Sequence, residues 1–180
     1  MTMARISLMA WAENSGQDLA GQSQQQVADA ALRYLGRRDY TAWELSQRLH
    51  ERGAASADIK ETLQYLRQRA YQSDERAGES HIRRRLSSAP RGRELVRQEL
   101  LVRGIAEELV ASLLDEHYPP QAEYALLKRL LDKEDTPRPA NPEQARRLWQ
   151  KMMRRYTAKG FEQTMLLEEL AVRLPGVENA

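Results

Sequence analysis

The sequence predicts an all-α protein built from three tandem three-helix repeats in an elongated, curved array. Residues that favour helix dominate the 180-residue chain, which has 24 Leu against 10 Ile plus Val. No segment alternates apolar and polar residues over the length of a strand. A short pattern that ends in glycine also occurs three times, as expected of a repeat protein.

Each copy of this pattern has two apolar residues four apart, then a basic residue and a glycine. The copies are Leu45–Gly53, Val96–Gly104 and Met152–Gly160. Apolar residues four apart share one face of a helix, and a glycine after a basic residue is typical of a helix end. Apolar residues recur six and ten positions after each glycine, which predicts a second amphipathic helix. A further helix is expected before each copy, at about 24–38, 74–87 and 121–134.

Polar residues mark the expected helix starts. The candidate cap residues are Ser23, Thr41, Ser56, Ser73 and Asn141. The first two are followed by Gln26 and Glu44, which completes the capping-box pattern. Asn141 is followed by proline, a favoured first residue of a helix.

These boundaries divide the chain into three repeats at 23–70, 71–118 and 119–176. Residues 1–22 are expected to form a flexible tail, since their short apolar patch is too brief for a signal peptide. The segment 135–142, which holds three prolines, is expected to link two helices. No apolar run approaches the ~20 residues that span a membrane, so we expect a cytoplasmic protein without membrane contact.

Basic residues concentrate in two stretches although the net charge is only +2. Arg76 to Arg103 holds eight basic and three acidic residues, and Arg138 to Lys159 holds seven and one. These stretches predict basic faces for a polyanion, either a nucleic-acid backbone or an acidic protein groove. The alternative is that the arginines are solvated or pair with the acidic helices of the same or the next repeat. The candidate partner-binding or nucleic-acid-binding residues are Arg83, Arg84, Arg85, Arg91, Arg93, Arg97, Arg103, Arg146, Arg147, Lys151, Arg154, Arg155 and Lys159.

Signs of catalysis are missing from the sequence. There is no cysteine, and His50, His81 and His117 lack a second ligand at metal spacing. No phosphate-binding glycine loop or nucleophile-elbow motif occurs. We therefore expect no enzyme, cofactor or metal. Trp43 and Trp149 are interpreted as packing residues rather than base-stacking platforms.

The order of these elements resembles the RecX family of recombinase regulators. The first repeat is similar in Ala31-Leu32-Arg33-Tyr34-Leu35, in Thr41-x-x-Glu44-Leu45 and in Leu49-x-x-Arg52-Gly53. The second is similar in Tyr71-Gln72-Ser73-Asp74, in Glu99-Leu100 and in Arg103-Gly104-Ile105. The resemblance covers about residues 27–175. It also implies an aromatic residue followed by Ala after Asp74, where this sequence has Arg76-Ala77-Gly78.

The resemblance implies a cytoplasmic bacterial protein that binds the RecA–DNA filament. Such a protein would inhibit strand exchange and ATP hydrolysis, and moderate the co-protease activity of RecA in the SOS response. We expect a monomer that binds naked DNA weakly and in a salt-dependent way. The alternative function is direct DNA binding, in which the helix at 93–103 or at 143–159 enters a groove as in a helix-turn-helix protein.

Overall fold

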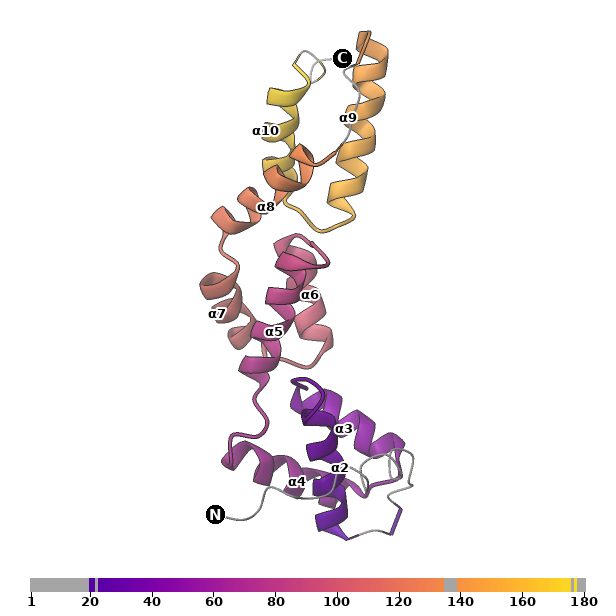
Figure 1. Ribbon diagram of the computed structural model, residues 1–180, viewed down its shortest axis with the longest axis vertical. Helices are drawn as coiled ribbons and strands as arrows, with labels where there is room; N and C mark the ends of the chain where they lie inside the picture. The colour runs from indigo at the N-terminus through magenta and orange to yellow at the C-terminus, as the bar shows by residue number, and fades with distance from the viewer. Residues whose placement is uncertain (1–19, 22, 135–138, 176, 178–180) are drawn as a thin grey trace. The chain divides into compact units, whose positions relative to one another are not determined.

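The computed structural model describes residues 20–21, 23–134, 139–175 and 177, and its regular structure over these residues is entirely helical (Figure 1). The helices are α2 (Gln24–Leu35), α3 (Ala42–Glu51), α4 (Ser56–Gln68), α5 (Asp74–Ser87), α6 (Arg93–Val102), α7 (Glu107–His117), α8 (Pro120–Asp132), α9 (Pro142–Thr157) and α10 (Gln163–Arg173). They confirm the all-α class and the succession of three helix triplets. The prediction for the tail lies outside the described residues, apart from residues 20 and 21.

The glycine that ends each pattern adopts a backbone that other residues avoid. Gly53, Gly104 and Gly160 have φ angles of 83°, 78° and 82°. The residue after each glycine donates its backbone N–H to a carbonyl five residues back, as in a Schellman motif. These donor and acceptor pairs are Ala54 with Leu49, Ile105 with Leu100, and Phe161 with Tyr156. The same turn therefore occurs three times, as the sequence predicts.

The helix starts agree with the sequence except at Ser56. Thr41 Oγ1 accepts the Glu44 amide, and Asn141 Oδ1 accepts the Gln144 amide. Ser73 Oγ accepts the Arg76 amide. The prediction for Ser56 is wrong because Ala55 occupies the cap position. The glycine turn places the cap two residues after the glycine in every repeat, at Ala55, Ala106 and Glu162.

The chain divides into two compact units, with the boundary between Ala77 and Gly78. The first contains α2, α3 and α4, which Figure 1 shows in indigo to purple. In this unit α2 packs mainly against α4, and the core includes Val27, Leu45, Leu49 and Leu66, all 0% exposed.

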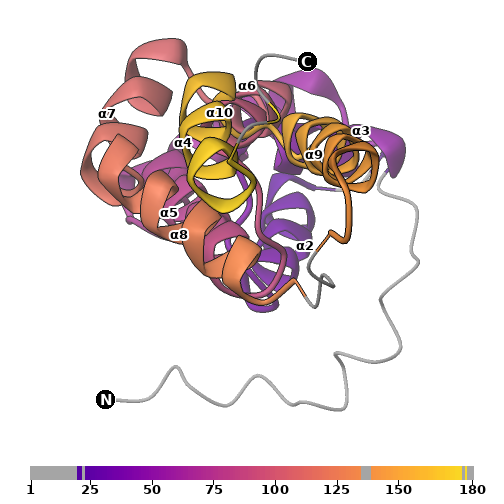
Figure 2. The same ribbon diagram turned by 90° about the horizontal axis from the view of Figure 1, so that it is seen from above.

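The second unit contains α6 to α10 and most of α5, and one continuous core runs through it. Ile82, Leu100, Leu127 and Leu166 belong to this core and come from four different helices. Figure 2 shows α8 beside α10, and these helices also contact each other. The predicted second and third repeats thus share a core. The residues at which one repeat ends and the next begins remain predictions.

Two close approaches hold the second unit together. The Gly92 amide donates to the Lys159 carbonyl over 2.8 Å, and a Cβ on Gly92 would lie 2.0 Å from the Gly160 carbonyl oxygen. A Cβ on Gly78 would likewise lie 2.5 Å from a methyl carbon of Leu113. Gly78 therefore lets the first turns of α5 approach the Leu113 side chain of α7.

Carboxylates from a following helix cap the middle helices of the first two triplets. Asp74 at the start of α5 accepts the Ala42 amide at the start of α3, over 2.7 Å. Glu123 in α8 accepts the Arg93 amide at the start of α6, over 2.9 Å. The cap residue of α6 is Gly92, which has no side chain, so α6 depends on Glu123 for this bond. Burial raises the pKa of Glu123, while hydrogen bonds from backbone amides favour its charged form.

Candidate partner-binding surface

Helix α9 carries basic residues along one face. Its apolar side chains Met152 and Tyr156 are buried, and Trp149 packs partly against the same core. With about 100° between successive residues, Arg147, Lys151 and Arg154 fall on the opposite side of the helix, and Arg146 and Arg155 lie at the two edges of that side. We call this side the α9 basic face; it consists of Arg146, Arg147, Lys151, Arg154 and Arg155, all exposed. Glu143 is the only carboxylate in α9.

Three of the five cations of the α9 basic face have no ion-pair partner among the described residues. Arg147 pairs with Glu143 over 2.6 Å, and Arg155 pairs with Glu134 over 2.9 Å. Within the described parts of the chain, Arg146, Lys151 and Arg154 have no carboxylate within 4.0 Å. These three side chains are available for an external partner.

Lys159, just beyond α9, lies close to other cations. Its ammonium group is 5.1 Å from the centre of the Tyr156 ring. Burial lowers the Lys159 pKa, and the nearby charges of Arg155 and Arg91 lower it further. The structure therefore brings together Arg91, Arg155 and Lys159, which the sequence places in two different repeats.

The three consecutive arginines of α5 have different surroundings. Arg85 makes a bidentate pair with Glu99, with nitrogen–oxygen distances of 2.7 and 2.8 Å. Arg84 contacts His81 Nδ1 over 3.1 Å. Arg83 is exposed, and its side chain has no carboxylate within 4.0 Å in the described structure. Among the described residues, only Arg85 of the three has an ion-pair partner.

The buried His81 lies between Arg84 and Glu99. Arg84 can only donate, so His81 Nδ1 accepts and the proton lies on Nε2, which donates to Glu99 over 2.6 Å. Burial lowers the His81 pKa, and the charges of Arg103 and Arg84 act in the same direction. Burial alone would raise the Glu99 pKa, but the hydrogen bonds from Arg85 and His81 outweigh it and lower that pKa.

The arginines of α6 point mainly to internal partners. Arg93 binds the Tyr118 carbonyl over 3.1 Å and also pairs with Asp115. Arg97 pairs with Glu94 and with Glu107 of α7. The two remaining candidates, Arg91 and Arg103, are half-buried. For α6 the structure therefore supports the internal-pairing alternative.

A contact that recurs in each triplet, between the first helix or the residues just after it and the second helix, was not predicted from the sequence. It joins Tyr34 with Arg48, Arg85 with Glu99, and Glu134 with Arg155. The first pair is a cation–π contact of 5.7 Å, and the other two are ion pairs of opposite polarity. The repeat period could have revealed these positions, because the first two pairs are offset by 51 residues at both ends.

Trp43 is exposed, contrary to its interpretation from the sequence. We interpret it from the sequence as a packing residue, but its side chain is 48% exposed. It lies two residues before Leu45, so it projects from the side of α3 opposite the core. Trp149 is partly buried, in agreement with its predicted packing.

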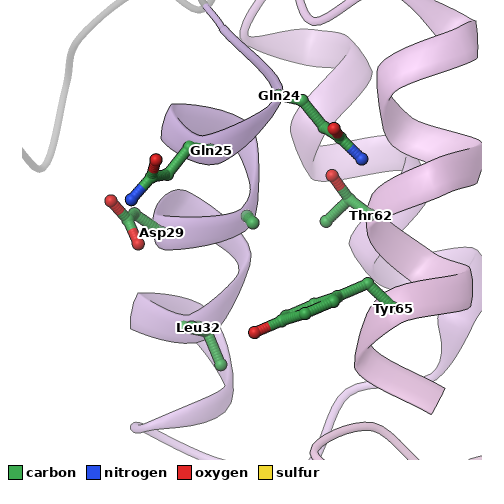
Figure 3. Close-up of a pocket in the computed structure, with 7 residues that line it drawn as sticks. Gln24, Gln25, Asp29, Leu32, Thr62 and Tyr65 are labelled. Carbon is green, nitrogen blue, oxygen red and sulfur yellow. The ribbon is translucent and has the colours of Figure 1, made fainter. Parts of the chain in front are cut away.

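The described residues show neither a metal site nor a membrane-spanning helix, but they do form a groove. They include no group of three or more His, Asp or Glu side chains arranged to hold a metal ion. None of their helices has both the length and the apolar character needed to cross a membrane. A groove of about 300 Å³ lies between α2 and α4, lined by side chains that include Asp29, Thr62 and Tyr65 (Figure 3).

Comparison with known proteins decides the family. Residues 29–66 match the family model described as "RecX, first three-helix domain". The regulatory protein RecX of Herbaspirillum seropedicae is 32% identical over 138 residues, which cover 77% of this chain and 84% of that protein. The chain belongs to the RecX family. The crystal structure of RecX from Lactobacillus salivarius has the same fold, with a TM-score of 0.64 over 84% of this chain and 96% of that one, at 18% identity.

The RecX relatives differ in how much of their length is matched. The regulatory protein RecX of Legionella pneumophila is 38% identical over 98 residues. That alignment covers 54% of this chain and 65% of the relative, so the match spans slightly less than two thirds of its length.

Proposed function

We propose that the protein regulates the RecA recombinase by binding the RecA–DNA filament. Bound protein would reduce strand exchange and the linked ATP hydrolysis, and would moderate the co-protease activity that drives the SOS response. The protein would act as a cytoplasmic monomer, by binding and without catalysis or a cofactor. Membership of the RecX family, whose relatives are named regulatory proteins, supports this proposal.

The observation that carries the proposal is the α9 basic face. A filament of protein on DNA is a long polyanion, and an exposed row of cations increases its rate of encounter with such a partner. Arg146, Lys151 and Arg154 supply charge that no carboxylate among the described residues pairs with. Arg83 in α5 adds another exposed cation. The remaining candidate residues would act mainly by holding these helices in place.

The proposal is tested by DNA-dependent ATP hydrolysis of RecA, with and without the protein. We expect hydrolysis to slow at protein concentrations well below those of the DNA sites, because one bound molecule affects a cooperative filament. Unchanged hydrolysis and strand exchange at a stoichiometric excess of protein would overturn it.

Direct DNA binding without RecA is the second candidate function, and the α9 basic face favours it too. Here α9 would enter a groove of duplex DNA. Tight binding to one duplex sequence that persists at high salt would support this alternative. Weak binding that falls steeply with salt would instead fit a protein that acts on the filament.

A further inference from the structure

The α9 basic face has both the charge and the shape of a nucleic-acid contact. We propose that it binds the phosphate backbone of nucleic acid without reading the base sequence. This inference rests on the proposed function and deepens it, because it assigns one surface to one component of the filament. The third helix triplet, rather than the second, would then make the main contact with DNA.

The cations of the α9 basic face are closely spaced along the helix. The 16 residues of α9 extend over about 24 Å at 1.5 Å per residue. Arg147, Lys151 and Arg154 follow one another at steps of about 6 and 4.5 Å along the axis. Phosphates form a continuous line of like charges, which flexible cationic side chains can follow without a fixed register.

The described residues of the α9 basic face include no apolar anchor. Protein interfaces take much of their stability from buried aromatic or aliphatic residues near their centre. The large hydrophobic residues exposed in the described structure are Trp43, Tyr65, Tyr71, Val102, Tyr124, Leu167 and Val172. None of them lies in α9. A cationic face without an anchor suits a polyelectrolyte better than an acidic protein groove.

The aromatic residues of α9 are not placed to stack on bases. Proteins that hold single strands often stack bases on exposed aromatic side chains. The aromatic residues of α9, Trp149 and Tyr156, instead pack into the core, and the Tyr156 hydroxyl donates to Glu134 over 2.9 Å. The face is left with charge alone, which positions a backbone but carries no sequence information.

Helix α6 differs from α9 in how its arginines are paired. Arg93 and Arg97 have carboxylate partners on α7. The charge of α6 is therefore largely neutralised within the protein. At the end of α9, positive charge is in excess. Arg91, Arg155 and Lys159 lie near one another, and Glu134 is the carboxylate that pairs with Arg155.

The test measures binding of the full chain to labelled single-stranded oligonucleotides of two unrelated sequences by fluorescence anisotropy, without RecA. The variant Lys151→Gln/Arg154→Gln removes two cations of the face, and glutamine keeps the helix propensity. We expect about 20-fold weaker binding near 0.1 M salt, and a salt slope reduced by about 1.4, for both sequences. The matched control, Lys60→Gln/Lys128→Gln, removes two exposed cations outside the face. It should change affinity less than about twofold.

The possible results separate this inference from the proposed function. Equal losses in variant and control would mean that only net charge matters, and would overturn the inference. Unchanged DNA binding combined with weaker binding to the RecA filament would assign the face to protein and would also overturn it. Loss of DNA binding in the variant, with no effect of the wild type on RecA ATP hydrolysis, would keep the inference and overturn the proposed function. Circular dichroism checks that both variants are folded.

Discussion

Arg83, Arg84 and Arg85 are consecutive, and their side chains nevertheless have three different roles. Each residue turns the side chain by about 100° around α5, so the three point in different directions. Arg85 reaches the half-buried Glu99, Arg84 reaches His81, and Arg83 remains in solvent. At this scale, the position of a cation on its helix decides whether it stabilises the fold or is available to a partner.

Replacement of Arg85 and of Arg83 by alanine should therefore have different effects on stability. Arg85→Ala leaves the Glu99 carboxylate without its bidentate partner, and only 22% of that side chain is exposed. We expect the free energy of unfolding to fall by about 2 kcal/mol. Arg83→Ala should change it by no more than about 0.5 kcal/mol. Urea unfolding followed by circular dichroism measures both, and equal effects would contradict the roles assigned here.

At the scale of elements, the repeats share a turn and differ in how their helices are joined. The turns at Gly53, Gly104 and Gly160 are alike in backbone angle and hydrogen bonding. The pair between first and second helices changes from a cation–π contact to two ion pairs of opposite polarity. If α5 packed against α9 in place of its own partner α6, Arg85 would face Arg155. The repulsion between these two cations disfavours such an exchange between the second and third triplets.

Replacement of Gly92 by alanine tests the junction between α6 and the end of α9. The new Cβ would lie 2.0 Å from a backbone oxygen, so the two segments must separate. We expect the free energy of unfolding to fall by about 3 kcal/mol. The control is Gly36→Ala, where φ is −66° and the nearest atom would be 3.5 Å away. Thermal unfolding should show a stability that is unchanged or raised by about 0.5 kcal/mol. A Gly92→Ala variant as stable as this control would contradict the close approach.

The helices and turns were predictable because they depend on local sequence. The apolar spacing of Leu45 and Leu49 defines a helix face, and Gly53 defines its end, with no information from elsewhere in the chain. The caps from Asp74 and Glu123 were not predictable, since each acts on an amide about 30 residues away. For the same reason the sequence could not distinguish Arg93, which is paired, from Arg154, which has no carboxylate partner among the described residues. Their chemistry is identical, and only the packing of α6 against α7 brings Asp115 to Arg93.

At the scale of the whole molecule, two hydrophobic cores divide the chain unequally. The first core is confined to α2, α3 and α4 with their connections, and the second extends from α5 to α10. In the second unit Glu123 and Gly92 add polar and backbone contacts between the predicted second and third repeats. The α9 basic face therefore belongs to the larger unit, whose stability supports its geometry.

The two units should respond independently to core substitutions in the full-length chain. Leu127 is 0% exposed in the second core, and Leu127→Ala should destabilise that unit by about 2–5 kcal/mol. Native-state hydrogen exchange should then accelerate at amides of both α6 and α9, because these helices share the core, while amides of α3 keep their protection. Leu49→Ala should produce the reverse pattern, since Leu49 is equally buried in the first core. If Leu127→Ala accelerated exchange in α9 but left α6 unchanged, the second and third triplets would be separate folding units, and the continuous core would not act as one.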